Sequence, residues 1–209
     1  QFYLKTFGTP AVAAYGVALR VEQLFLLPVF GLTGALLPIA AQNFGARQSE
    51  RVRLSLLTCW KFGWVFMFVA CPLLYFSAPL LMRSFTSDLA VIDIGVSYLR
   101  VDVFVLPIYM MLFAINSFLQ ALKRPIWTLL IGIYRQAFGV AFFSFVFVYF
   151  WGFGVVGVWY GIATSVLTGM ILSLFIANQV ALPIVGGIFS GQEAKKPTTK
   201  QLKDLIFAF

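Results

Sequence analysis

Six charged side chains lie within or near long apolar stretches of this sequence. They are Arg20, Glu22, Lys61, Arg100, Asp102 and Arg135. A charge near the centre of a bilayer costs something like ~2.5–3.5 kcal/mol on insertion scales. Such residues usually face a bundle interior or a water-filled cavity and have a partner there. They are therefore the first candidates for a functional site.

Glu22 and Arg135 are the sharpest of these candidates. Helical rise places Glu22 roughly 16 Å below one end of its helix and Arg135 about 15 Å from the start of its own, so both lie near mid-bilayer. They could form a buried structural pair if their helices are neighbours. Arg20 lies two residues from Glu22, about 200° around a helix, so these two side chains do not face each other. A carboxyl beside a water-filled cavity could instead serve proton coupling, and both explanations of Glu22 stay open.

The other charges have simpler explanations. Lys61 lies near the cytoplasmic end of its apolar stretch, where a long side chain reaches the interface. Arg100 and Asp102 lie about a turn and a half inside the boundary of theirs. Snorkelling, or pairing with a neighbouring helix, explains these two as well as a functional role does.

Two prolines interrupt the apolar stretches. Pro28 leaves the carbonyl of Leu24 without its usual donor, and Pro107 does the same for Val103. Irregular backbone at membrane depth is tolerated where it is buried in protein or lines a cavity. We therefore expect kinks at both prolines, either as static packing features or as hinges.

The stretch after Pro107 presents a soft, aromatic and weakly polar surface. Such a surface suits a cavity for amphipathic cations, although ordinary helix packing uses the same residue types. The candidate lining residues are Tyr109, Met110, Phe113, Asn116 and Gln120.

Composition predicts the elements that position these residues. Of 209 residues, 61% are hydrophobic and 11% charged, whereas a soluble domain is nearer half apolar and a quarter charged. Apolar runs of about 20 residues, the length that crosses a bilayer core, recur along the chain. We expect an all-α, polytopic membrane helix bundle over residues 11–182. Its spans are predicted at residues 11–40, 56–82, 95–121, 126–150 and 156–182.

Charge distribution predicts orientation. Basic residues gather in the links after the first and third spans and in the tail of residues 183–209, which predicts a multi-pass protein of the cell membrane with a cytoplasmic C-terminus. The same asymmetry accounts for the net charge of +8 without nucleic acid as a partner.

Several kinds of site are not expected. The sequence has two cysteines and no histidine, so we expect neither a metal site nor a haem. HExxH, GxSxG and Walker A motifs are absent, and we do not expect an enzyme or a cofactor.

Three stretches resemble one known family. Residues 11–46, followed by a basic linker, resemble the eighth helix of the multidrug and toxic compound extrusion (MATE) transporters. Residues 98–125 look like the tenth helix and its following turn, and residues 154–165 look like the start of the twelfth. The order of the helices, the loop lengths and the orientation fit this family over residues 1–185.

The resemblance implies an architecture. MATE transporters have twelve helices in two lobes that rock around a central cavity. This chain would be the C-terminal six-helix lobe, with five full transmembrane helices plus the end of a sixth. Residues 1–10 would hold the end of helix seven and an outer loop, and the N-terminal lobe would be missing.

The resemblance also implies a coupling ion. Family members exchange their substrates for protons or sodium. In the sodium-coupled branch the later half of helix ten carries an acid, but residues 107–122 contain none, and Asp102 lies too early to match. This favours proton coupling, with the key acid in the missing N-terminal lobe.

We therefore expect a secondary active multidrug efflux antiporter that exports small cationic, amphipathic compounds in exchange for H⁺ (or Na⁺). Tyr109, Met110 and Phe113 would line its cavity. The alternatives are a lipid-linked oligosaccharide flippase of the same superfamily and an accessory membrane subunit that transports nothing. The expected polar network of the antiporter consists of Arg20, Glu22, Gln23, Asn116, Gln120 and Arg135.

Overall fold

The computed structural model describes residues 2–188, with Phe2 described by its backbone alone. In this range the regular structure is helical throughout, and five helical runs are long and apolar enough to cross a membrane. The expected all-α membrane bundle is thus confirmed. Residues 189–209, most of the expected cytoplasmic tail, lie outside the described residues.

After a short helix α1 (Phe2–Lys5), the five runs are α2 (Thr9–Gly45), α3 (Ser49–Phe85), α4 (Leu89–Ala121), α5 to η2 (Pro125–Phe150) and α7 (Gly154–Val185).

The helices extend past the apolar spans that hydropathy predicts. α2 and α3 have 37 residues each, about 55 Å by helical rise against a hydrocarbon core of about 30 Å. The extra turns at the ends carry polar residues, among them Gln42, Asn43 and Arg51. Neither Pro28 nor Pro107 ends its helix.

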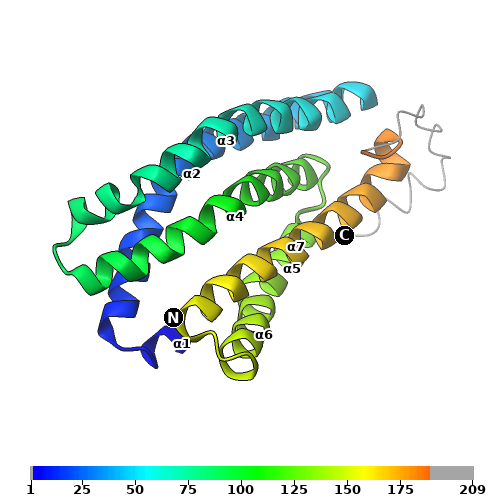
Figure 1. Cartoon of the computed structure of the whole chain (residues 1–209). Helices are drawn as coiled ribbons and strands as arrows, with labels where there is room; N and C mark the ends of the chain where they lie inside the picture. The colour runs from blue at the N-terminus through cyan, green and yellow to red at the C-terminus, as the bar shows by residue number, and fades with distance from the viewer. Residues whose placement is uncertain (1, 189–209) are drawn as a thin grey trace.

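α4 lies at the centre of the bundle. Eighteen of its 33 residues are buried, against ten of 37 in α2. Figure 1 shows α4 between the α2–α3 pair on one side and α7 on the other, and it packs against all three. Side chains of α4 therefore meet three other long helices, while Arg100, Phe104 and Gln120 stay exposed.

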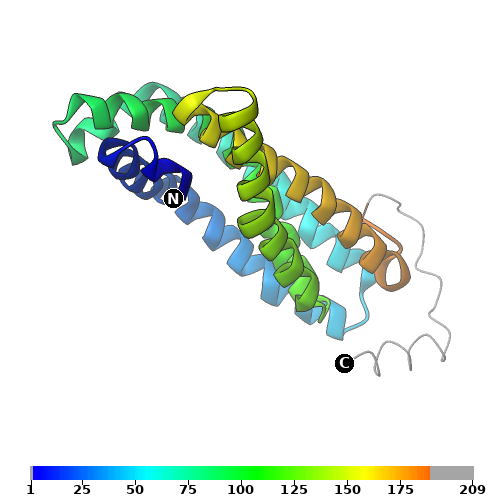
Figure 2. The same cartoon turned by 90° about the horizontal axis from the view of Figure 1, so that it is seen from below.

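The fourth run changes its helical period twice. It consists of α5 (Pro125–Ile133), the π-helical turn η1 (Tyr134–Gly139), α6 (Val140–Phe145) and a second π-helical turn, η2 (Val146–Phe150). The run packs against α7 mainly through η1, α6 and η2, and Figure 2 shows the two diverging toward α5. Widened turns of this kind often occur at functional sites, and η1 carries Arg135.

Small residues at four-residue spacing let α7 approach this run closely. At Gly161 an added Cβ would lie 2.6 Å from the backbone nitrogen and Cα of Ser144. At Gly157 it would lie 3.0 Å from the carbonyl of Phe147. Small residues at such spacing allow membrane helices to come into backbone contact.

Candidate functional site

Glu22 lies on the buried face of α2 and is 6% exposed. Its Oε2 accepts a hydrogen bond of 2.6 Å from the hydroxyl of Tyr98 on α4. Hydrogen bonds to an ionised group are shorter and stronger than neutral ones. Ala18 and Ala14, one and two turns earlier on the same face, are fully buried and allow α2 to approach α4. The sequence of α2 thus places one carboxylate, that of Glu22, in the interior of the lobe.

Asp102 delivers a second carboxylate to the same place. It follows Tyr98 by one helical turn on α4, so the two side chains share a face. Asp102 is 2% exposed, and its Oδ2 has no hydrogen-bond partner among the described residues. The carboxylates of Glu22 and Asp102 lie close enough to interact electrostatically. Burial excludes snorkelling as the explanation of Asp102.

Arg135 contacts an aromatic ring rather than an acid. Its guanidinium lies 5.3 Å from the ring centroid of Tyr109 on α4, within cation–π range. On α7, a Cβ at Gly169 would lie 3.4 Å from the Arg135 side chain, so glycine leaves room for it. The Nε of Arg135 is buried and has no partner within residues 2–188.

The direct pair between Glu22 and Arg135 that the sequence left open does not form. Among the described residues the salt bridge found joins Arg53 to Glu50. Arg135 and Glu22 still interact electrostatically at longer range. Each of the two charges has a tyrosine of α4 as its nearest polar or aromatic partner.

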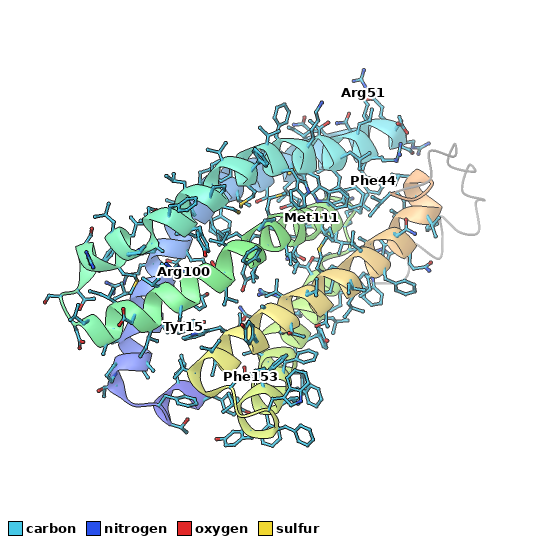
Figure 3. The ribbon with its side chains drawn as sticks, viewed as in Figure 1. Tyr15, Phe44, Arg51, Arg100, Met111 and Phe153 are labelled. Atoms are coloured by element: carbon cyan, nitrogen blue, oxygen red, sulfur yellow. The ribbon has the colours of Figure 1, made fainter. Side chains whose placement is uncertain are left out.

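An aromatic cluster packs beside the two carboxylates where α2, α4 and α7 meet. The ring of Tyr15 lies edge-on to Tyr98 at 5.4 Å and stacks on Trp159 at 5.7 Å. Tyr98 and Trp159 are 4.9 Å apart, and the indole nitrogen of Trp159 donates to Ser97 Oγ at 3.2 Å. Tyr15 is labelled in Figure 3. These rings cover the carboxylates on the side where α4 and α7 begin.

Arg20 and Gln23 do not join this cluster. Both are exposed on a surface of α2 that carries small and polar residues with Leu24 and Leu27 between them. We call this surface the α2 face. α3 differs, because the exposed residues in its middle part are mostly bulky and apolar, as at Phe68 and Phe76. The α2 face consists of Gly16, Arg20, Gln23, Gly31 and Gly34.

The remaining expected residues divide between the site, the surface and the core. Phe113 stacks on Tyr109 at 5.9 Å and meets Phe30 of α2 edge-on at 5.2 Å. The side-chain oxygen of Asn116 is buried without a partner among the described residues, and Gln120 is exposed.

Met110 lies in the core of the lobe. It is fully buried and fills the space that Gly63 of α3 leaves open. Four of the expected site residues lie together with Tyr98 and Asp102. These four are Glu22, Tyr109, Phe113 and Arg135.

Sequence reasoning missed Tyr98 as a member of this site and left Asp102 between a functional role and simpler explanations. The signal that could have revealed them is their spacing. Tyr98, Asp102 and Tyr109 are four and seven residues apart, which places them along one stripe of a helix. Arg100, between the first two, belongs to another face.

The two buried carboxylates of the cluster suit a proton or a small monovalent cation. Within residues 2–188 no group of three or more histidine, cysteine or acidic side chains could hold a metal ion. Two buried carboxylates that interact electrostatically repel each other when both are charged. A proton or a monovalent cation that neutralises one of them relieves this repulsion.

Comparison with known proteins assigns the family. The sequence profile of the MatE family matches residues 1–146. The chain belongs to the MATE transporter family. This family consists of membrane transporters, so the prediction that the chain is not an enzyme is confirmed, as is its multi-pass membrane character.

Two curated relatives of this MATE chain carry different functional names. The FAD transporter of Shewanella oneidensis is 35% identical over 132 residues, which cover 60% of this chain and 28% of that protein. The probable multidrug resistance protein NorM of Thermotoga maritima is 24% identical over 174 residues, which cover 80% and 36%. The chain therefore spans about a third of the length of these relatives.

A solved structure supports the fold. The MATE transporter VcmN of Vibrio cholerae, in its bent form, superposes with a TM-score of 0.79 at 22% identity and covers 86% of this chain and 40% of that one.

The hydrogen bond between Tyr98 and Glu22 predicts a stability effect. Tyr98→Phe keeps the ring contacts but removes the hydroxyl donor from a buried carboxylate, which should lower the free energy of unfolding by about 1–3 kcal/mol. Tyr149→Phe, at a ring that is 57% exposed, is the matched control and should have no effect. Thermal melting in detergent measures both, and equal melting of Tyr98→Phe and the wild type would contradict this role.

Proposed function

We propose that this chain forms the C-terminal lobe of a secondary active multidrug antiporter of the cell membrane. The transporter exports amphipathic compounds in exchange for H⁺ (or Na⁺), and its C-terminus lies in the cytoplasm. Membership of the MATE family and the resemblance of α2, α4 and α7 to helices eight, ten and twelve support this assignment. The multidrug name of the Thermotoga relative, which aligns with 80% of the chain, supports the substrate class.

The observation that carries the coupling mechanism is the joint burial of Glu22 and Asp102. Two charges of one sign interact more strongly in a dry interior than in water, and the single hydroxyl of Tyr98 serves only Glu22. Binding of one proton or one monovalent cation to these carboxylates would let α2 and α4 pack closely. Its release would separate the carboxylates. The lobe would then have a coupling site of its own, whatever acid the N-terminal lobe contributes.

The aromatic residues next to this site suit an amphipathic substrate. Phe30, Phe113 and Tyr109 form a continuous series of ring contacts from the edge of α2 to the Arg135 guanidinium. Flat rings can stack along such a series, and the amide of Gln23 offers both a donor and an acceptor nearby on α2.

One observation favours a second substrate class. Arg20 is exposed on the α2 face, whereas the acid of that helix, Glu22, is buried. A surface with an accessible guanidinium and no accessible carboxylate favours an anionic aromatic molecule. The relative with 35% identity is named for such a compound, FAD.

The coupling proposal predicts the effect of neutralising either buried acid. In the intact transporter, Glu22→Gln and Asp102→Asn should each lower dye efflux, measured as proton-driven dye uptake into everted membrane vesicles, roughly tenfold, because coupling energies are of this order. They should also flatten its pH dependence. Asp93→Asn, an exposed acid of the same helix α4, is the control and should transport normally. Unchanged efflux and pH dependence in Asp102→Asn would refute the coupling role.

Arg20 separates the two substrate classes. If the substrate is an anion such as FAD, Arg20→Gln should weaken its transport roughly tenfold, the usual effect of losing a charge-assisted hydrogen bond. Ethidium transport should be unchanged or improved in the same variant. A loss of ethidium transport with no effect on FAD would reject the anionic substrate.

A further inference from the structure

Arg100 points away from the polar cluster. It lies two residues before Asp102 on α4, about 200° around the helix, and its side chain is exposed. Its guanidinium lies 5.5 Å from the ring centroid of Tyr75 on α3. Within residues 2–188 no carboxylate lies at salt-bridge distance from it. Figure 3 labels it on α4.

A groove of about 450 Å³ begins at Arg100. Its floor is α4 and its walls are α3 and α7, which contribute Tyr75 and Leu167. From Arg100 to Ile108 it follows α4 for about 12 Å by helical rise, and beyond the guanidinium its lining is almost wholly apolar. The groove therefore has a cationic end and a hydrocarbon-like length.

The surface around the groove has the character of a lipid-facing surface. Phe104 in the groove is 74% exposed, and Ile171, further along α7, is 61% exposed. Large apolar side chains at such exposure are stable next to acyl chains and costly in water. The α2 face, with its glycines and polar residues, is a different surface of the lobe.

An unpaired arginine on such a surface requires an anion. Arg100 lies near the beginning of the apolar part of α4, within reach of the interface for a long side chain. The anions that a bilayer supplies at this depth are lipid phosphates and acidic headgroups. The ring of Tyr75 holds the guanidinium through a cation–π contact and restricts its rotamers.

We propose that the groove between α3, α4 and α7 binds an anionic phospholipid. Its phosphate contacts the Arg100 guanidinium beside Tyr75. One acyl chain follows the groove past Phe104 and Leu167. The bound lipid joins α4 to α7 on the surface opposite the carboxylates. This inference depends on the chain spanning a membrane and not on what it transports.

Native mass spectrometry of the intact protein, titrated with phosphatidylglycerol or phosphatidylcholine, tests the proposal. Arg100→Gln should weaken phosphatidylglycerol binding roughly five-fold, the usual value of one basic residue toward anionic lipid, and so remove its preference over phosphatidylcholine. Ala163→Phe, which fills the groove and keeps the charge, should weaken binding of both lipids. Arg83→Gln, at an exposed arginine at the end of α3, is the control and should bind as the wild type does.

Thermal melting supplies a second readout that folding defects cannot imitate. Phosphatidylglycerol should raise the melting temperature of the wild type and of Arg83→Gln, but not that of Arg100→Gln. Arg100→Lys keeps the charge and should retain most of the effect. Unchanged phosphatidylglycerol binding in Arg100→Gln or in Ala163→Phe would overturn the proposal. An Arg100→Gln protein that melts lower by the same amount with and without lipid would also overturn it, because stabilisation by lipid would then not depend on the guanidinium.

Discussion

The hydrogen bond from the Tyr98 hydroxyl to the Glu22 carboxylate joins α2 to α4 at a depth that water does not serve. A charge in that position needs a donor from another helix, so the bond fixes how the two helices face each other. The fully buried Ala14 and Ala18 allow the close approach that the 2.6 Å contact requires. α3 and α7 pack on other faces of α4, so that α4 lies at the centre of the bundle.

With α2 and α4 joined in this way, the polar groups of the lobe form two sets that face different directions. Tyr98, Asp102 and Tyr109 share one stripe of α4 and face the interior with Glu22 and Arg135. Arg100, on another face of the same helix, contacts Tyr75 at the surface. A transporter needs one surface that meets its substrate and another that meets lipid. The α2 face and the groove have the compositions that these two environments demand.

Much of the fold follows from the sequence, because backbone groups in hydrocarbon must be satisfied within each span and only helices do so over a single segment. The cost of burying charge likewise marked Glu22 and Arg135. The partners of Glu22 and Arg135 could not be predicted from the sequence, since hydropathy says nothing about which face of α4 meets which neighbour. The π-helical turn at Tyr134–Gly139 also shifts the helical phase, so a regular period cannot place Arg135 over Tyr109. From the sequence, Arg100 and Asp102 had the same candidate explanations. In the structure Arg100 is exposed and Asp102 is buried.

The central claim is that the α2 face meets water in a transport pathway, whereas α3 meets lipid. Single cysteines at Gln23 and Gly34, and at Phe68 of α3, test it in the intact protein after Cys59 and Cys71 are replaced by alanine. A charged, membrane-impermeant thiol reagent should modify the two α2 cysteines, with protection by bound substrate, and should leave the cysteine at position 68 unmodified. Modification at position 68 with none at positions 23 and 34 would contradict the account.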